Sequence, residues 1–279
     1  MTMPAPFNDK VVVVTGGASG IGLALARRFA RDKARIAILD LDADGARDEA
    51  QLLAATGIQT VALACDVSRR ADCRNAVDRV LERFGGIDVL INNAGITARD
   101  RFVETRAEVF DRVMAVNFFG ALHCTQAAIA SLRRRRGLIM VVESLAGVSP
   151  LLGRSAYCAS KHALHGLFTT LRAELRHEGV HVLIACPGFV QTNLQRRALG
   201  GDGRVTDRPQ SRVGGQTTPE QVAEELYRAA VRRRPLAVLT PVGKLAYAIS
   251  RLAPHFYERL MARRLAVELG RGQMPEARP

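Results

Sequence analysis

The segment 11–30, VVVVTGGASGIGLALARRFA, constrains the fold of this chain more than any other. A wholly apolar run leads into a turn that contains Gly16, Gly20 and Gly22, and an amphipathic stretch follows at once. Glycines allow a tight turn and a close approach of the backbone to a ligand. A helix that starts at such a turn offers free N–H groups and the positive end of its dipole to a pyrophosphate. The order strand, glycine turn, helix therefore predicts a dinucleotide-binding site.

Apolar runs of strand length alternate with amphipathic stretches of helix length along most of the chain. The expected strands are 11–15, 35–40, 60–66, 88–92, 137–144, 180–186 and 236–240. The expected helices are 20–32, 43–56, 69–84, 107–133, 154–178 and 218–233. Most of the strand runs are continuously apolar, which is typical of strands buried on both faces of a parallel sheet. We predict an α/β fold: a doubly wound, seven-stranded parallel sheet of the Rossmann type, with helices on both faces.

Neither a repeat nor a linker divides this pattern, so residues 1–279 are expected to form one domain with a core of about 8–240. Residues 191–218 are polar, rich in glycine and longer than an ordinary connection. They could be a surface insertion, or a lid that orders over a ligand, because ligands of α/β proteins bind where strands end. The arginines of this segment could meet an anionic substrate group or only solvent; they are Arg196, Arg197, Arg204, Arg208 and Arg212.

The tail, about 241–270, extends beyond the alternating pattern, and we expect a C-terminal helical extension there. Leu245, Ile249, Leu252 and Phe256 recur at helical spacing, and Pro254 should break or kink the helix. The tail could pack on the core or on another subunit. Alternatively, its basic residues and apolar face could form a peripheral contact with an anionic membrane.

The net charge of +13 is compatible with a nucleic-acid partner, but its distribution argues against one. Eleven Arg and Lys against three Glu follow residue 227, so +8 of the charge lies in the C-terminal segment. Aromatic residues do not interleave with the basic runs to form a stacking platform for bases. We expect no nucleic-acid partner.

Cysteine usage and the N-terminus predict a cytoplasmic protein. The five cysteines are odd in number, lack metal-ligand spacing and fall mostly in apolar runs, which favours buried, reduced thiols and no metal site. The N-terminus lacks a secretory signal pattern, and no apolar run of about 18 residues, the length of a membrane span, is apparent.

Asp40 ends the second expected strand, about 20 residues after the glycine turn. A carboxylate there can accept hydrogen bonds from the adenosine ribose and would repel a 2′-phosphate. Ser19, inside the turn, provides no positive charge for such a phosphate. Both features favour NAD over NADP, although Asp40 could instead serve only as a helix cap.

The stretch YCASK places Tyr157 four residues before Lys161. Positions i and i+4 share one face of a helix, so the phenol would stand beside an ammonium. A positive neighbour lowers the pKa of a phenol, and the pair could be a general acid/base near neutral pH. Because Tyr and Lys at this spacing also occur by chance, the pair alone does not decide.

Several motifs together resemble the short-chain dehydrogenase/reductase family in its common single-domain form. They are the glycine turn, NNAG at 92–95, Asn117, Ser144, Tyr157-x-x-x-Lys161 and PG at 187–188. They occur in the family's order and at its usual spacing, and the resemblance covers about residues 8–240.

The resemblance implies a catalytic role for four residues. Tyr157 would exchange a proton with the substrate oxygen, and Lys161 would lower the pKa of Tyr157 and hold the nicotinamide ribose. Ser144 would stabilise charge on the substrate oxygen. Asn117 would bend its helix and hold a water that relays protons from Lys161.

The resemblance also implies a set of cofactor contacts, each of which could be purely structural. Beside Tyr157 and Lys161 they are Gly16, Ser19, Gly20, Ile21, Gly22, Asp40, Asp66, Val67, Asn93, Ala94, Gly95, Pro187, Gly188, Val190 and Thr192. Asp66 and Val67 would meet the adenine, and the last four would hold the nicotinamide.

The expected function is an NAD-dependent oxidoreductase that transfers a hydride between the nicotinamide and a hydrophobic secondary alcohol or ketone. Apolar residues after Ser144 favour such a substrate, which could be alicyclic, steroid-like or fatty. The alternative is a non-catalytic dinucleotide-binding redox sensor, which would not need a complete set of proton-transfer residues. Family likeness also implies a homotetramer or homodimer.

Overall fold

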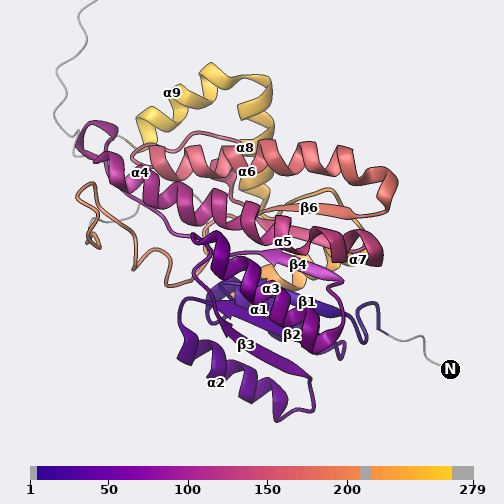
Figure 1. Ribbon diagram of the computed structural model, residues 1–279. Coiled ribbons are helices and arrows are strands. Elements are labelled where there is room, and N and C mark those ends of the chain that lie inside the picture. The colour runs from indigo at the N-terminus through magenta and orange to yellow at the C-terminus, as the bar shows by residue number, and fades with distance from the viewer. Residues whose placement is uncertain (1–4, 208–214, 266–279) are drawn as a thin grey trace, which may run out of the picture.

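The structure is a computed structural model that describes residues 5–207 and 215–265 (Figure 1). Its centre is a seven-stranded sheet with the order β3-β2-β1-β4-β5-β6-β7, in which every neighbouring pair is parallel. The strands are β1 (Val11–Thr15), β2 (Arg35–Asp40), β3 (Thr60–Ala64), β4 (Val89–Asn92), β5 (Leu138–Val142), β6 (His181–Cys186) and β7 (Leu236–Val238). The predicted doubly wound parallel sheet and its seven strands are confirmed, with several expected strands one to three residues too long.

Helices cover both faces of the sheet. They are α1 (Gly20–Ala30), α2 (Ala43–Ala54), α3 (Arg70–Phe84), α4 (Ala107–Met114), α5 (Gly120–Arg135), α6 (Ser155–Glu174), α7 (Pro219–Val231), α8 (Pro241–Leu252) and α9 (Pro254–Leu265). One core cluster joins α1, α2 and α7 to one face, and another joins α3, α5 and α6 to the opposite face. Because both faces are covered, every side chain of β1 is buried, whichever face of the sheet it points to.

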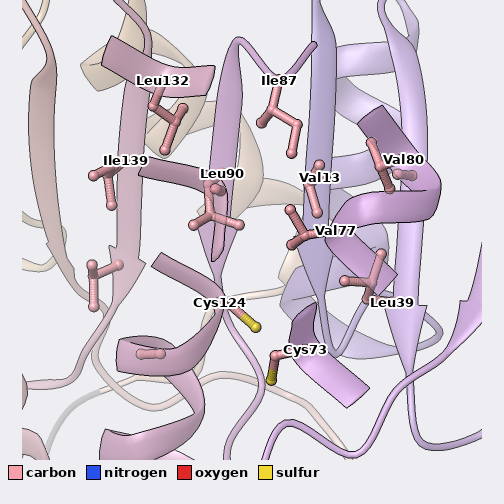
Figure 2. Packing of buried hydrophobic residues seen from close by; sticks show 14 of the residues in the cluster. Val13, Leu39, Cys73, Val77, Val80, Ile87, Leu90, Cys124, Leu132 and Ile139 are labelled. Atoms are coloured by element: carbon pink, nitrogen blue, oxygen red, sulfur yellow. The ribbon is translucent and has the colours of Figure 1, made fainter. Parts of the chain in front are cut away.

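The second core cluster also contains most of the cysteines. Figure 2 shows Cys73 and Cys124 beside one another among the apolar side chains between the sheet and α3 and α5. Cys65 and Cys186 are buried as well, Cys158 is partly buried, and all five thiols are free. The prediction of buried, reduced thiols is confirmed for four of the five. Among the described residues, no cluster of His, Cys, Asp and Glu is arranged to hold a metal ion.

The strand order creates a ligand crevice at the edge where the parallel strands end. The chain runs outward from β1 to β2 and β3, then returns to place β4 on the other side of β1. At such a switch point neighbouring crossovers diverge and leave a cleft beyond the carboxyl ends of the strands. The glycine turn after β1 and the segment after β4 therefore lie side by side.

The expected helix 107–133 is interrupted by a π-helical turn at Ala115–Phe119, between α4 and α5. The whole helical stretch Ala107–Arg135 is long and apolar enough to cross a membrane by length and composition alone. This finding corrects the expectation that no such segment is present. Core helices of soluble proteins meet the same criterion, and this stretch packs against α3 and α6.

The tail packs on the loop that follows Ser144. Pro254 separates α8 from α9, as expected, and Figure 1 shows both helices (yellow) beside α6. The Tyr257 hydroxyl donates to Ser149 Oγ at 3.2 Å, and Ser250 Oγ donates to the Val148 carbonyl at 3.1 Å. The prediction of a helical extension is thus confirmed through residue 265, and residues 266–270 lie outside the described part. Peripheral membrane contact stays a prediction.

Part of the expected lid is anchored to the segment after β4. The Leu199 amide donates to the Thr97 carbonyl at 2.9 Å, and the Arg99 amide donates to the Leu199 carbonyl at 2.7 Å. Arg196, Arg197 and Arg204 are exposed, whereas Arg208 and Arg212 lie outside the described residues. Closure of 191–218 over a ligand stays a prediction.

Candidate active site

The glycine turn is held in a shape that side chains would disrupt. Gly16 and Gly20 have φ of 62° and 55°, in the left-handed region. A Cβ on Gly22 would overlap the carbonyl oxygen of Gly16, so α1 can approach the turn closely only because position 22 is glycine. Ser19, the N-cap of α1, makes no side-chain hydrogen bond to the first turn. The N–H groups at this helix end are therefore available to an anion such as a pyrophosphate.

Asn93 joins the turn to the end of β4. Its Nδ2 donates to the carbonyl oxygens of Thr15 and Gly16, both at 3.0 Å. The backbone amides of Asn93 and Ala94 donate to Thr15 Oγ1 at 3.0 and 3.1 Å. The structure thus shows these residues supporting the turn, and the contact with a cofactor that the resemblance implies for them stays a prediction.

Asp40 lies at the end of β2, beside the glycine turn. Its Oδ2 accepts from the Ala18 amide at 2.9 Å and its Oδ1 from the Asp42 amide at 3.0 Å. The cap of α2 is Asp42, whose side chain accepts from the Gly45 amide, so Asp40 is not the helix cap. An ionised carboxylate offers about four acceptor positions, and Asp40 therefore keeps capacity for ribose hydroxyls.

Two further groups of expected cofactor residues lie at the ends of β3 and β6, on either side of the strands described above. Asp66 Oδ1 accepts from the amide and hydroxyl of Ser68, and Val67 is buried against Gly120. After β6, Pro187 is buried, and Thr192 lies over the glycine turn, where a Cβ on Gly20 would be 3.2 Å from its Cγ2. The fold thus gathers residues from β1, β2, β3, β4 and β6 along one edge of the sheet.

A cleft of about 780 Å³ opens beside the same turn, between α1, α7 and the segment after β6. Gly20, Val190 and Thr192 line its inner end, and Arg27 and Arg196 are among its outer residues. The predicted catalytic residues do not line this cleft. The cleft therefore adjoins the glycine turn and not the proton-transfer residues.

The β5 strand end and α6 bring the expected proton-transfer residues together. Ser144 follows β5 and accepts from the Ala146 amide at 3.2 Å, while Tyr157 and Lys161 lie on the buried face of α6. The Ser144 side chain lies close enough to the Tyr157 phenol to lower its pKa. Lys161 Nζ lies 5.7 Å from the centre of the Tyr157 ring. The structure thus brings together the Tyr157–Lys161 pair, which the spacing predicts, and Ser144, which the resemblance implies.

The pKa of Tyr157 differs in direction from the sequence-based expectation. Burial raises the pKa of the phenol to about 12, and this effect exceeds the lowering by the hydrogen bond from Ser144. Lys161 Nζ donates to the Val142 carbonyl at 3.0 Å. The net pKa of Tyr157 is therefore raised by desolvation, and the lowering that the resemblance implies for Lys161 stays a prediction.

Lys161 is itself strongly perturbed. Burial lowers the pKa of its ammonium to about 8, and the negative charge of Glu143 opposes this decrease. An amine with a pKa close to neutral pH can exchange protons with solvent under ordinary conditions.

Asn117 lies within the π-helical turn, which widens the helix at this residue. Its Oδ1 accepts from the Ile96 amide at 2.8 Å, and its Nδ2 donates to the Ile96 carbonyl at 3.0 Å and to Ser160 Oγ at 2.9 Å. A Cβ on Gly95 would be 3.2 Å from Asn117 Oδ1 and 3.8 Å from Lys161 Nζ. Asn117 thus fastens α6 to the segment after β4, and the expected water relay stays a prediction.

Two residues beside this group did not emerge from the sequence. Glu143 is a buried carboxylate next to Ser144, and His165 contacts it from α6. The available signal was a single charge at the end of an otherwise apolar run, LIMVVE, which was included in the expected strand. A sequence pattern does not show whether such a charge points into the core or into solvent.

The burial of Lys161 should make it a destabilising residue. Its folded-state pKa is lower than its unfolded value, so the unfolded chain binds more protons between about pH 8 and 10.5, and stability rises with pH across that window. Below pH 8 the full cost applies, about 3 kcal/mol at 1.4 kcal/mol per pKa unit. Lys161→Met should therefore raise the free energy of unfolding at pH 7 by about 2 kcal/mol, after the loss of one hydrogen bond.

Urea unfolding at pH 7 and pH 10.5 would measure this gain. It should shrink at the higher pH, where the wild-type amine is neutral in the folded protein and only half protonated in the unfolded chain, so most of the cost has gone. Lys244→Met on α8, an exposed lysine, is the control and should change little. A less stable Lys161→Met protein at pH 7 would contradict the argument.

The residues at this edge fit a nicotinamide dinucleotide. The open N-terminus of α1 suits a pyrophosphate, the Asp40 carboxylate suits a ribose, and Tyr157, Ser144 and Lys161 lie two strands further along the sheet.

Comparison with known proteins agrees with this geometry. The family model described as short chain dehydrogenase matches residues 10–200. The chain is 36% identical over 276 residues to "Dehydrogenase/reductase SDR family member 7B" of Bos taurus, covering 96% of this chain and 85% of that protein. It is also 36% identical over 259 residues to "Probable oxidoreductase EphD" of Mycobacterium tuberculosis, covering 89% of this chain and 44% of the relative.

Solved structures show the same fold. An alcohol dehydrogenase from the archaeon Thermococcus sibiricus, complexed with 5-hydroxy-NADP, superposes with a TM-score of 0.71 and 28% identity over 82% of this chain and 93% of that one. A short chain dehydrogenase/reductase from Burkholderia phymatum in complex with NAD has a TM-score of 0.76 over 99% and 100% of the two chains; at 24% identity it supports the fold alone. The matched family model, the relatives and the assembled site agree: this chain belongs to the short-chain dehydrogenase/reductase family of oxidoreductases.

Proposed function

We propose that this protein is an NAD-dependent oxidoreductase that interconverts a hydrophobic secondary alcohol and its ketone. The observation that carries the proposal is the group formed by Ser144 after β5 and by Tyr157 and Lys161 on the buried face of α6, with Lys161 Nζ 5.7 Å from the centre of the Tyr157 ring. A bound nicotinamide would supply the hydride chemistry, and the residues of this chain would handle the proton.

Each side chain of the group has a distinct task. During alcohol oxidation, the Tyr157 phenolate would take the hydroxyl proton; during ketone reduction, the phenol would return it. Ser144 would donate a hydrogen bond to the substrate oxygen where negative charge develops. The Lys161 ammonium would stabilise the phenolate electrostatically, and Asn117 would hold α6 in register with the segment after β4.

The loop after Ser144 supports a hydrophobic substrate. Ala146 and Val148 are buried, and Leu151 and Leu152 pack against Tyr257 and Met261 of α9. The tail therefore covers an apolar loop next to the proton-transfer group. A ligand that approaches Ser144 from this side would meet mainly aliphatic surface, which favours apolar carbon skeletons over charged ones.

The proposal can be tested with purified protein and a panel of alicyclic, steroid-like and fatty secondary alcohols. Formation of reduced nicotinamide, followed by absorbance with NAD⁺ and NADP⁺ in parallel, is the expected result. Dinucleotide binding by calorimetry without turnover on any alcohol or ketone would instead favour a non-catalytic redox sensor, which the family assignment and the complete proton-transfer group do not support.

Asp40 should set the choice of cofactor. Asp40→Ala removes the carboxylate that would repel a 2′-phosphate and accept ribose hydrogen bonds. We expect the ratio of kcat/KM for NAD⁺ to that for NADP⁺ to fall by roughly 10-fold or more, the equivalent of about 1.4 kcal/mol.

Asp42→Ala, which removes the cap of α2, is the matched control and should lower stability without changing the cofactor ratio. An equal ratio in the wild type and in Asp40→Ala would exclude this role for Asp40.

The cytoplasmic location, the single-domain organisation, the homodimer or homotetramer and the absence of a nucleic-acid partner remain part of the proposal. Gel filtration with light scattering would determine the oligomeric state.

A further inference from the structure

A carboxylate is buried directly behind the proton-transfer group. The Glu143 side chain has 0% exposure at the end of β5, one residue before Ser144. Its Oε1 lies 3.1 Å from His165 Nδ1, and its Oε2 accepts from the Cys186 thiol at 3.0 Å. A Cβ on Gly147 would overlap Oε1, so the following loop leaves space for this carboxylate and for nothing larger. A buried charge that is held so closely needs a counter-charge.

Lys161 is the buried cation next to Glu143. Its Nζ donates to the carbonyl of Val142, the residue before Glu143, at 3.0 Å, and it lies one helical turn before His165 on α6. Of the causes that act on the pKa of Lys161, burial is the largest and Glu143 is the first that opposes it. The other titratable groups that face Lys161 are Cys186 from β6 and Tyr157 from α6. Burial raises the pKa of the Cys186 thiol well above its usual range, so this group is neutral at ordinary pH. The negative charge beside Lys161 therefore comes from Glu143.

The hydrogen bonds around Glu143 fix the state of His165. An ionised carboxylate only accepts, so His165 Nδ1 must carry a proton. On the opposite side of the ring, Arg251 of α8 contacts Nε2 at 3.2 Å. A guanidinium only donates, so Nε2 must accept. His165 is accordingly the neutral Nδ1–H tautomer, and its donor is directed at Glu143 by a residue of the C-terminal extension.

We propose that Glu143 is a positioning residue, the buried counter-charge of Lys161, and that Arg251 fixes His165 as the hydrogen-bond donor to Glu143. Helix α8 then acts on proton transfer without touching the substrate. The effect of this arrangement on catalysis rests on the proposed function. The charge on Lys161 and the tautomer of His165 can be measured whether or not the protein is an alcohol dehydrogenase.

Turnover alone is a poor readout of this arrangement. Glu143 also raises the pKa of Tyr157, as the smallest of the named causes, and Arg154 lowers it. Replacing Glu143 thus lowers the pKa of both groups: a lower pKa of Tyr157 favours the phenolate, whereas a lower pKa of Lys161 weakens the positive charge that would stabilise it. The charge on Lys161 must be measured directly.

The chain suits a direct measurement because it contains only four lysines: Lys10, Lys33, Lys161 and Lys244. Full-length protein labelled with ¹³C at lysine Cε would be titrated by NMR, and the Lys161 signal is the one that is missing in Lys161→Met. In the wild type we expect a midpoint near pH 8. In Glu143→Gln the midpoint should fall by about 1 to 3 pH units, the effect of a close opposite charge.

Glu82→Gln on the exposed face of α3 removes the same charge elsewhere and should leave the midpoint unchanged. An unchanged Lys161 midpoint in Glu143→Gln would overturn the proposal. This result is readable even if no alcohol is oxidised, so it can be separated from failure of the proposed function.

A second measurement remains decisive if Glu143→Gln does not fold. ¹⁵N-histidine NMR of the wild type should show His165 at neutral pH with its proton on Nδ1. Arg251→Leu, an exposed change, should convert His165 to a tautomer mixture or to the charged form. A wild-type His165 with its proton on Nε2, or a spectrum unaffected by Arg251→Leu, would overturn the part assigned to α8.

Discussion

Tyr157→Phe should lower kcat by roughly 10²- to 10⁴-fold, because general acid/base catalysis by a positioned side chain contributes about that much. The substitution removes one oxygen atom and keeps the ring, which is buried at 9% exposure between Ser144 and Lys161. Dinucleotide affinity measured by calorimetry should stay within a few-fold of the wild type, since the ring, the glycine turn and Asp40 are unchanged.

The pH profile provides a second readout of Tyr157. Oxidation requires the phenolate, and burial raises the pKa of this phenol to about 12 in the free protein. The rate of oxidation should therefore increase with pH through the neutral and mildly alkaline range, whereas reduction, which uses the protonated phenol, should not. This difference in slope should be lost in Tyr157→Phe.

Tyr227→Phe is a suitable control. Tyr227 is another buried tyrosine, and its hydroxyl donates to Asp32 Oδ2 at 2.6 Å beside α1, in the opposite helical layer. Its removal should cost about 1 to 3 kcal/mol of stability, because Asp32 loses a partner, and leave kcat unchanged. Near-normal turnover in Tyr157→Phe would exclude the proposed mechanism.

Ser144→Ala should lower kcat/KM by roughly 10²- to 10³-fold, the usual effect of removing one donor to a developing oxyanion. The hydroxyl also lowers the pKa of Tyr157 through its hydrogen bond. Its loss should therefore move the rise of the oxidation rate to higher pH, which a purely structural role for Ser144 would not do.

Ser131→Ala provides the matched control for Ser144. Ser131 is buried at the end of α5 and accepts from the Ile87 amide at 2.8 Å, away from the candidate site. Steady-state kinetics between pH 6 and about 10 should show a normal profile for this variant. If Ser144→Ala also kept the wild-type rate and profile, Ser144 would be only the cap of the turn that follows β5.

Local patterns predicted most of the fold because each strand is apolar along its whole length. A run such as VVVV at 11–14 can be satisfied only between two layers of helices, so it indicates a central strand of a parallel sheet. The glycine turn was equally informative, because its φ values and its contact with α1 exclude side chains. The interruption at Ala115–Phe119 was missed as an element, since a π-helical turn has the same apolar spacing as the helix that contains it.

The sequence by itself determined the layers, the strands and the residue types of the proton-transfer group, because periodicity and fixed spacing are local properties. Only the tertiary structure decided their energetics. The pKa of Tyr157 is raised rather than lowered, because desolvation depends on everything packed around the phenol and not on the residue four positions away. Glu143, His165 and Arg251 come from β5, α6 and α8, and a chain of contacts between such distant segments has no local signature.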